Sequence, residues 1–314
     1  AKNEPYLLSW NGGAAGYSEV SDSREDEDYF STNIYSDYTK SLGNHNFKVM
    51  AGFNAELYRP SGLNGFGTDL ISADVPSLGL TQDNKKASSW ARERAIAGFF
   101  GRINYNYADR YMLEANLRYD GSSRFIGDQR WGLFPSFSAG WNIAQEKFFA
   151  PATKVVDQLK LRFSYGQLGN QNTSSYYPTY RVMSLGAANG TWIQNGMQPN
   201  TASVGSLISE ALTWETVRTW DIGLDWGLLN NRLTGSADYF IRYTKNMVGP
   251  ADQMPNTLGI SVPNTNNCDL QTRGWEVSLS WKDRLNNGLN YGVTLSLSDQ
   301  TTYIDSYPGN KTGS

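Results

Sequence analysis

The sequence predicts an all-β fold, a membrane-spanning antiparallel β-barrel domain of about ten or eleven strands. Three observations predict it: apolar and polar residues alternate along many segments, short and long connections alternate between those segments, and the composition favours strands. The composition combines 10 Trp, 19 Tyr and 13 Phe with 31 Gly among 314 residues. Aromatic residues favour strands, and glycine favours the turns that join them.

Alternation with a period of two residues is clearest from Arg110 to Asp120. Successive side chains of a strand point to opposite faces, so this segment has one apolar and one polar face. Six segments have such an apolar face: Phe99, Ile103, Tyr105 and Tyr107; Tyr111, Leu113, Ala115, Leu117 and Tyr119; Leu159, Leu161, Phe163 and Tyr165; Trp220, Ile222, Leu224 and Trp226; Ala237, Tyr239, Ile241 and Tyr243; Trp275, Val277, Leu279 and Trp281. Further strands are expected near residues 29–40, 46–58, 132–145 and 290–298, with a weaker one at 6–17.

Several of these apolar faces begin or end in Tyr or Trp, with smaller residues between the rings. In a soluble β-sandwich the apolar face packs against a second sheet, and nothing requires rings at the strand ends. An outer-membrane barrel exposes that face to about 25 Å of hydrocarbon between two aromatic girdles, which requires strands of about ten residues. The predicted strands have this length, so the barrel is favoured.

The connections between the predicted strands strengthen this interpretation. Tight periplasmic turns and long extracellular loops alternate in outer-membrane barrels. The predicted short links are residues 41–45, 108–110, 230–231 and 283–288, with a somewhat longer one at 146–158, and the predicted long ones are 59–94, 121–131, 169–213 and 247–270.

Charge and composition exclude several classes of function. With 27 Lys and Arg against 30 Asp and Glu, the chain lacks the basic footprint of a nucleic-acid-binding protein. His45 and Cys268 are the only residues of their kinds, so an internal disulfide, a Cys/His zinc site and the usual catalytic pairs are not expected. Carboxylates on the polar faces could act as a glycosidase pair. Because Arg and Lys alternate with them, mutual neutralisation is favoured, and we predict neither an enzyme nor a cofactor.

Four short motifs each allow two interpretations. The acidic stretch Asp22–Asp28 could bind Ca²⁺, but such a run is more often a solvated loop. Gly62–Gly67 superficially resembles a phosphate-binding loop, yet it lacks the strand-to-helix context, so a flexible loop is expected. Cys268 is expected in a loop, where a lone thiol is a poor nucleophile. His45 is expected to be a turn residue.

The connection from Gly169 to Thr213 is the best candidate for ligand or partner contact. It contains four rings among Asn, Gln, Ser and Thr, a mixture that can stack on sugar rings or apolar peptide side chains while it hydrogen-bonds polar groups. The alternative is that these rings only pack the loop or belong to an aromatic girdle. The candidate residues are Tyr176, Tyr177, Tyr180 and Trp192.

An ordered series of motifs resembles the SusC/RagA family of TonB-dependent outer-membrane transporters, from roughly Tyr29 to Asp299. Before Tyr29 no family motif is recognisable. The motifs are Gly101–Tyr107, Arg110-Tyr111, Leu117–Phe125, Trp131–Trp141, Leu159–Arg162, Ser164–Gln171, Trp214-Glu215, Asp238–Phe240, Thr244-Lys245 and Gly274–Glu276.

The resemblance implies that residues 1–314 are a partial barrel domain, roughly half of a 22-stranded barrel. We expect the plug, its TonB box and the closing strands to lie outside these residues. The chain begins at Ala1 without a signal-peptide pattern and stops at Ser314 without a closing strand. An open half-barrel would leave unpaired edges in lipid, which is not tolerated.

The implied function is TonB-driven import of an oligosaccharide or oligopeptide across the bacterial outer membrane. The implied partners are a SusD-like surface lipoprotein that acts as a lid, TonB through the plug, the surrounding lipid, and a second transporter–lid pair in a homodimer. Two other classes remain open: a passive porin or surface adhesin barrel, and a secreted β-sandwich that binds or cleaves glycans.

Overall fold

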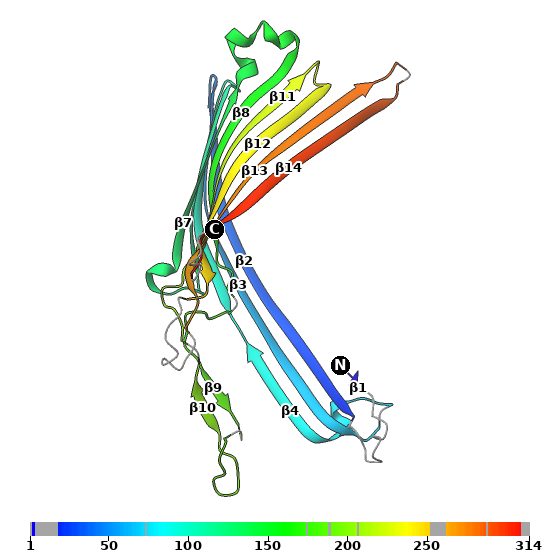
Figure 1. Ribbon diagram of the computed structural model, residues 1–314, viewed down its shortest axis with the longest axis vertical. Coiled ribbons are helices and arrows are strands. Elements are labelled where there is room, and N and C mark those ends of the chain that lie inside the picture. Colours follow the sequence, from blue (N-terminus) through cyan, green and yellow to red (C-terminus); the bar gives the residue numbers. More distant parts are fainter. Residues whose placement is uncertain are drawn as a thin grey trace. The chain divides into compact units, whose positions relative to one another are not determined.

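The computed structural model describes residues 2–3, 18–72, 74–173, 175–187, 190–205, 207–251, 262–286 and 288–308. As the alternation predicts, most of the described chain is in strands (Figure 1). The strands are β1 (Lys2–Asn3), β2 (Glu19–Leu42), β3 (His45–Leu70), β4 (Thr81–Ala91), β5 (Arg94–Tyr107), β6 (Tyr111–Ser122), β7 (Trp131–Asn142), β8 (Val156–Asn170), β9 (Met183–Gly186), β10 (Thr201–Val204), β11 (Glu215–Leu228), β12 (Leu233–Gly249), β13 (Thr265–Arg284) and β14 (Asn290–Ser306). Five short 3₁₀ helices lie in the connections: η1 (Leu78–Leu80), η2 (Gly127–Gln129), η3 (Ile143–Gln145), η4 (Lys147–Phe149) and η5 (Ala152–Lys154).

The main sheet has the order β1-β2-β3-β5-β6-β7-β8-β11-β12-β13-β14, and β4 pairs with β3 beside this path. β9 and β10 form a separate two-stranded sheet. From β5 to β14 every neighbouring pair in the main sheet is antiparallel. This up-and-down order is the one expected for a membrane barrel. In the described part of the chain no helix is long and apolar enough to cross a membrane.

The chain divides into two compact units, one formed by Ala1–Thr32 and Ala55–Ala95 and the other by Asn33–Asn54 and Ile96–Ser314. The four residues predicted to contact a ligand or partner, Tyr176, Tyr177, Tyr180 and Trp192, lie in the second unit. Its strands also carry the register that confirms the predicted faces.

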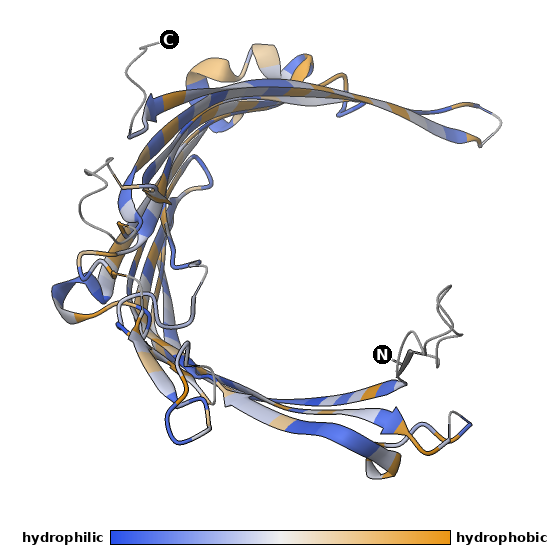
Figure 2. Cartoon of the chain, turned by 60° about the horizontal axis from the view of Figure 1, so that its bottom comes forward, coloured by the Kyte–Doolittle hydropathy of each residue, from blue (hydrophilic) through white to orange (hydrophobic). Residues whose placement is uncertain are grey.

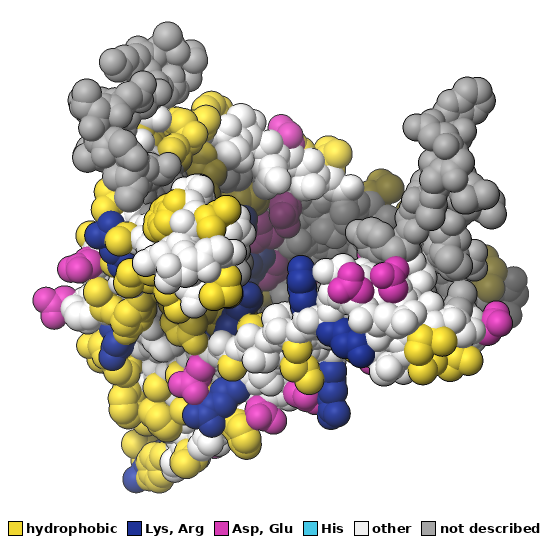
Figure 3. Space-filling view, turned by 90° about the horizontal axis from the view of Figure 1, so that it is seen from below, with side chains coloured by type: hydrophobic (Ala, Val, Ile, Leu, Met, Phe, Trp, Pro, Cys, Tyr) yellow, Lys and Arg dark blue, Asp and Glu magenta, His cyan; other side chains and the backbone are white. Residues whose placement is uncertain are grey.

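The register aligns the predicted apolar faces into one continuous surface across neighbouring strands. Leu113 lies opposite Ala139, which lies opposite Phe163. On the next strand Ile222 lies opposite Phe163, and Tyr239 lies opposite Ile222. The large side chains among them, Leu113, Phe163, Ile222 and Tyr239, are exposed rather than buried, and so are their neighbours Phe99, Leu117, Trp220, Val277, Leu295 and Leu297. Figure 2 shows the alternating hydropathy along the strands, and Figure 3 shows hydrophobic side chains gathered in large patches on the molecular surface.

Aromatic rings mark both ends of this apolar surface. Tyr107 and Tyr111 lie beside the short turn between β5 and β6, with ring centroids 6.3 Å apart. At the other end of β6, Tyr119 stacks on Trp131 at 4.9 Å. Tyr111 and Tyr119 are separated by roughly 26 Å along an extended strand. That span is comparable to the apolar band of an outer-membrane barrel, which is about 25 Å tall.

Short turns lie at one end of the second unit and long loops at the other (Figure 1). Neighbouring turns share hydrogen bonds, because the amide of Ala108 donates to Asn44 O at 2.8 Å and that of Asn142 donates to Arg110 O at 2.7 Å. The long connections between β6 and β7, β8 and β11, and β12 and β13 all lie at the opposite end. The predicted ends of these connections are confirmed for this unit, but the alternation in length is not strict, because the β7–β8 connection at the short-turn end (residues 143–155) is longer than the β6–β7 connection at the opposite end (residues 123–130).

Three loop predictions were wrong because strands continue beyond the apolar band. Asp22–Asp28 belongs to β2, Gly62–Gly67 belongs to β3 where it pairs with β4, and Cys268 is buried in β13. Both faces of these extensions are largely polar, so apolar and polar residues do not alternate along them. Backbone hydrogen bonds to the neighbouring strands keep them extended. The weak strand expected at residues 6–17 lies outside the described residues.

At the short-turn end of the second unit, the carboxylate of Glu146 connects β6 to β7. Glu146 lies in the connection between β7 and β8. It accepts hydrogen bonds from the Tyr111 hydroxyl and from Trp141 Nε1, and it lies 3.6 Å from Arg110. These two hydrogen bonds, helped by the Arg110 charge, lower the pKa of Glu146 below its ordinary value.

The facing of β6 can be tested by placing the same charged residue on either side of the sheet. In the full-length protein, Leu117→Arg should destabilise the barrel by about 2–4 kcal/mol, because Leu117 faces lipid near the middle of the strand. Ser138→Arg is the matched control, because Ser138 lies on the polar face opposite Glu114. Unfolding in liposomes measures both costs, and equal costs would show that the faces are assigned wrongly.

The Glu146 contacts predict a pH-dependent stability. Because the folded-state pKa is lowered, the stabilisation is present above the unfolded-state pKa of about 4.3 and is lost as the pH falls through the lower folded-state pKa. Glu146→Gln should therefore lower the unfolding midpoint at pH 7, and this effect should fade as the pH falls through the lowered folded-state pKa. The exposed residue Asp128→Asn provides a control, and a Glu146→Gln effect that is independent of pH would contradict the assignment.

Candidate functional site: the outer loops and the polar face

An apolar cluster at the loop end fixes the long connections to the sheet. Phe125, Phe134, Leu212 and Trp214 are at least 94% buried, unlike the large side chains of the membrane-facing surface. The ring of Trp214 lies 5.6 Å from that of Phe125 and 5.3 Å from that of Phe134. Phe134 lies on the polar face, since it pairs with Arg118. It lies flat across Gly169, where an added Cβ would come within 2.1 Å of its ring.

Hydrogen bonds join two long loops and the start of β13 around this cluster. The amide of Thr213 donates to Asn266 Oδ1 at 2.9 Å, and its hydroxyl donates to Gln129 O at 3.2 Å. Trp214 Nε1 donates to Arg130 O at 3.0 Å. The loops after β6 and β10 and the start of β13 are therefore held together rather than being independent.

The structure brings three of the four predicted ring residues together. The ring centroids of Tyr176 and Tyr177 are 6.5 Å apart, and those of Tyr177 and Tyr180 are 6.3 Å apart and nearly perpendicular. Tyr176 is half-buried, whereas Tyr177 and Tyr180 are 41% and 50% exposed. We call these three residues the tyrosine cluster.

Trp192, the fourth candidate, lies in the connection between β9 and β10. This hairpin extends away from the main sheet (Figure 1). Trp192 is 59% exposed and is accompanied by other exposed apolar side chains on the hairpin and its flanks: Val182, Met183, Leu185, Ile193, Met197 and Val204. The sequence did not indicate this apolar hairpin, because its residues show no sustained periodicity.

Arg124 is a residue of this region that the sequence did not single out. Its side chain lies between the β6–β7 loop and the tyrosine cluster, and only 5% of the residue is exposed. Its guanidinium carbon lies 5.6 Å from the centroid of the Tyr176 ring. Nothing in a single sequence distinguishes a buried arginine in a polar loop from a solvated one.

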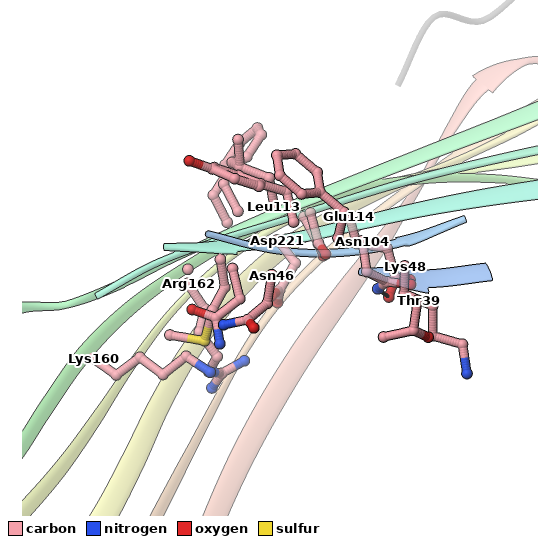
Figure 4. Close-up of a pocket in the computed structure, with 18 residues that line it drawn as sticks. Thr39, Asn46, Lys48, Asn104, Leu113, Glu114, Lys160, Arg162 and Asp221 are labelled. Carbon is pink, nitrogen blue, oxygen red and sulfur yellow. Dashed lines mark hydrogen bonds between the residues drawn. The ribbon is translucent and has the colours of Figure 1, made fainter. Parts of the chain in front are cut away.

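The polar face of the sheet contains a hollow of about 430 Å³ towards the short-turn end (Figure 4). Its polar lining includes Thr39, Asn46, Lys48, Asn104, Glu114, Lys160, Arg162 and Asp221. Glu114 accepts hydrogen bonds from Asn104 and Asn116. These residues provide charged and amide groups along a wall that would face the interior of a barrel.

Charges on this face neutralise one another, as the alternation of Arg and Lys with carboxylates predicts. Arg162 forms two hydrogen bonds to Asp225, at 2.8 and 2.9 Å, and one to Asp238 at 2.8 Å. Gly223 leaves room for this contact, because an added Cβ would lie 2.2 Å from Asp238 Oδ1 and 2.7 Å from the Arg162 guanidinium. Within the described residues, no group of three or more His, Cys, Asp or Glu side chains is placed to hold a metal ion.

Residues 2–314 match the family model described as TonB dependent receptor-like, beta-barrel, and the chain belongs to this family. It is 31% identical over 295 residues to the TonB-dependent receptor SusC of Bacteroides thetaiotaomicron, covering 92% of this chain and 27% of that protein. It is also 30% identical to the TonB-dependent receptor P3 of Formosa agariphila, covering 88% of this chain and 28% of that protein.

Solved structures agree on the fold. The RagAB peptide importer in its closed-closed state superposes with a TM-score of 0.83 at 20% identity, over 97% of this chain and 33% of the RagAB chain. The outer-membrane transporter YddB from Escherichia coli gives a TM-score of 0.54 at 12% identity, over 93% of this chain and 35% of that one. The chain thus spans about a quarter to a third of the length of the proteins it matches.

Family membership places the chain in the outer membrane and confirms both the predicted resemblance and the barrel fold. The matched proteins named above are receptors and transporters, not enzymes.

Proposed function

We propose that the full-length protein imports an oligosaccharide or an oligopeptide across the outer membrane, using energy delivered by TonB. The family match carries this proposal, and it favours energised transport over a passive porin or an adhesin. Of the matched proteins, RagAB is named a peptide importer. The tyrosine cluster suits either class of substrate, because rings stack on sugar faces and on apolar peptide side chains.

Residues 1–314 would then form one part of a larger barrel. Within the described residues, β14 pairs with β13 on one side and has no partner on the other. In lipid such an edge must be paired, so further strands would complete the wall around a plug. The hollow beside Lys160 and Arg162 would face that plug.

We further propose that the β9–β10 hairpin contacts a SusD-like surface lipoprotein acting as a lid. The hairpin lies at the loop end, so it would be outside the membrane, and it exposes Trp192 beside six other apolar side chains. An apolar patch of this kind on a loop in water marks an interaction surface, and Trp is enriched among residues that dominate such interfaces. A homodimer of the transporter–lid pair would follow from the same family resemblance.

Two sets of alanine variants of the full-length protein separate these roles. Tyr176→Ala/Tyr177→Ala/Tyr180→Ala should weaken substrate capture, at about 1 kcal/mol for each ring that the substrate buries. Trp192→Ala should instead reduce co-purification of the lipoprotein, because a buried interface Trp typically contributes about 2 kcal/mol or more. The half-saturation concentration for whole-cell uptake measures the first effect.

The matched control for the tyrosine cluster replaces all three residues with Phe, which keeps the rings and removes the hydroxyls. Barrel insertion should be unaffected in every variant, since none alters a membrane-facing side chain. If uptake and lipoprotein binding both stay at the wild-type level in correctly inserted alanine variants, these rings only pack the loop.

A further inference from the structure

We propose that Arg124 is the positioning residue that holds the tyrosine cluster in a fixed arrangement before the substrate binds; this inference rests on the proposed function of that cluster. Arg124 itself is buried and would not touch the substrate. Its effect would be transmitted through the chain on both sides of Tyr176 and Tyr177, and through Thr179 to the adjacent Tyr180.

The first observation is the burial of a guanidinium at the loop end of the sheet. A buried charge is costly unless hydrogen bonds compensate it. Arg124 Nη1 donates to the main-chain oxygen of Gln171 at 3.0 Å and to the hydroxyl of Thr173 at 3.1 Å. These acceptors both precede the tyrosine cluster in sequence.

A second contact comes from the other side of Tyr176 and Tyr177, from the residue that directly precedes Tyr180. The hydroxyl of Thr179, a residue that is only 2% exposed, donates to the main-chain oxygen of Arg124 at 3.1 Å. Arg124 therefore binds the loop before Tyr176 through its side chain and after Tyr177 through its backbone. A segment fixed at both ends has few alternative conformations.

Hydrogen bonds carry this restraint to the rings. The Thr173 hydroxyl, which accepts from Arg124, donates to Ser175 O at 2.7 Å. The Ser175 hydroxyl then accepts from the amide of Tyr177 at 3.2 Å. The guanidinium also lies over the Tyr176 ring, at 5.6 Å from its centroid. The contacts thus run outward from a buried cation to Tyr177 and Tyr180, the more exposed rings.

Lysine cannot replace these contacts. A guanidinium is planar and presents its N–H groups in a fixed fork, so one group can bind two acceptors while its face covers a ring. An ammonium at this position would keep the charge but lose that geometry. Because a fixed site loses less conformational entropy on binding, the arrangement should favour substrate capture rather than the later transport step.

Hydrogen exchange in the full-length protein tests the positioning role without a substrate. Arg124→Lys and Arg124→Ala should each speed amide exchange at residues 175–180 by about tenfold, which corresponds to loss of about one charge-assisted hydrogen bond. Arg181→Ala is the matched control, because Arg181 is an exposed cation in the same loop. Thr173→Val keeps Arg124 and removes one acceptor, so it should also speed exchange even if Arg124→Ala fails to insert. Wild-type exchange in Arg124→Lys and Thr173→Val would overturn the proposal.

Uptake measurements test the consequence for transport. The probes are a fluorescently labelled partial hydrolysate of starch and a labelled tryptic peptide mixture, and the variants are assayed with whichever one the wild-type protein imports. Arg124→Lys should raise the half-saturation concentration about tenfold at an unchanged maximal rate, whereas Arg181→Ala should match the wild type. A lower maximal rate at an unchanged half-saturation concentration would overturn the proposal.

The alanine variant of the tyrosine cluster distinguishes failure of the positioning role from failure of the proposed function. If that variant impairs capture and Arg124→Lys does not, the site stands and Arg124 has no positioning role. If neither impairs capture, the proposed site is wrong. If Arg124→Lys alone impairs capture, Arg124 acts on something other than the tyrosine cluster, which also overturns the proposal.

Discussion

The structure depends on one constraint, which is that the sheet exposes a continuous apolar face to a solvent that cannot form hydrogen bonds. Strand pairing satisfies the backbone groups in such a solvent, and this requirement explains why neighbouring strands pair over almost their whole length. It also explains why large side chains such as Phe99, Trp220 and Leu297 are exposed, while few large apolar residues are buried. In water this arrangement would expose an apolar surface far larger than soluble monomers tolerate.

The polar face follows from the same register. Because side chains alternate, the residues before and after each lipid-facing residue point to the opposite face, which would line the water-filled interior of a barrel. Charges on that face are stable only when they are solvated or paired. Arg162 meets this requirement through carboxylates on two other strands, and Gly223 provides the space for it to reach them. The wall is therefore polar, which suits a passage for solutes or a surface that contacts a plug.

Alternation made the fold class and the facing of β5, β6, β8 and β11–β13 predictable, because lipid on one side and water on the other impose the same period on every strand. The method failed where both faces meet water. Residues 22–28 and 59–94 carry no alternating signal, so loops are predicted there, although the first segment lies in β2 and the second contains the end of β3 and all of β4. The tyrosine cluster was predictable from composition alone, since three rings lie within five residues. The contacts of Arg124 were not, because Gln171 and Thr179 lie about fifty residues away in sequence and no local pattern joins them to it.

The loop end of the sheet follows the packing rules of soluble proteins, in contrast to the strands. Phe125, Phe134, Leu212 and Trp214 form a small dry core, and the polar groups around it are hydrogen-bonded between loops. Loops of this length would otherwise lose considerable conformational entropy when they order around a substrate. Lipid and ladder pairing order the strands, and this core with the Arg124 contacts orders the loops. Lipid therefore determines the packing of the strands, and water determines that of the loops. Phe134 lies on β7 but packs with the loops, so it connects the sheet to the surface that would contact the substrate.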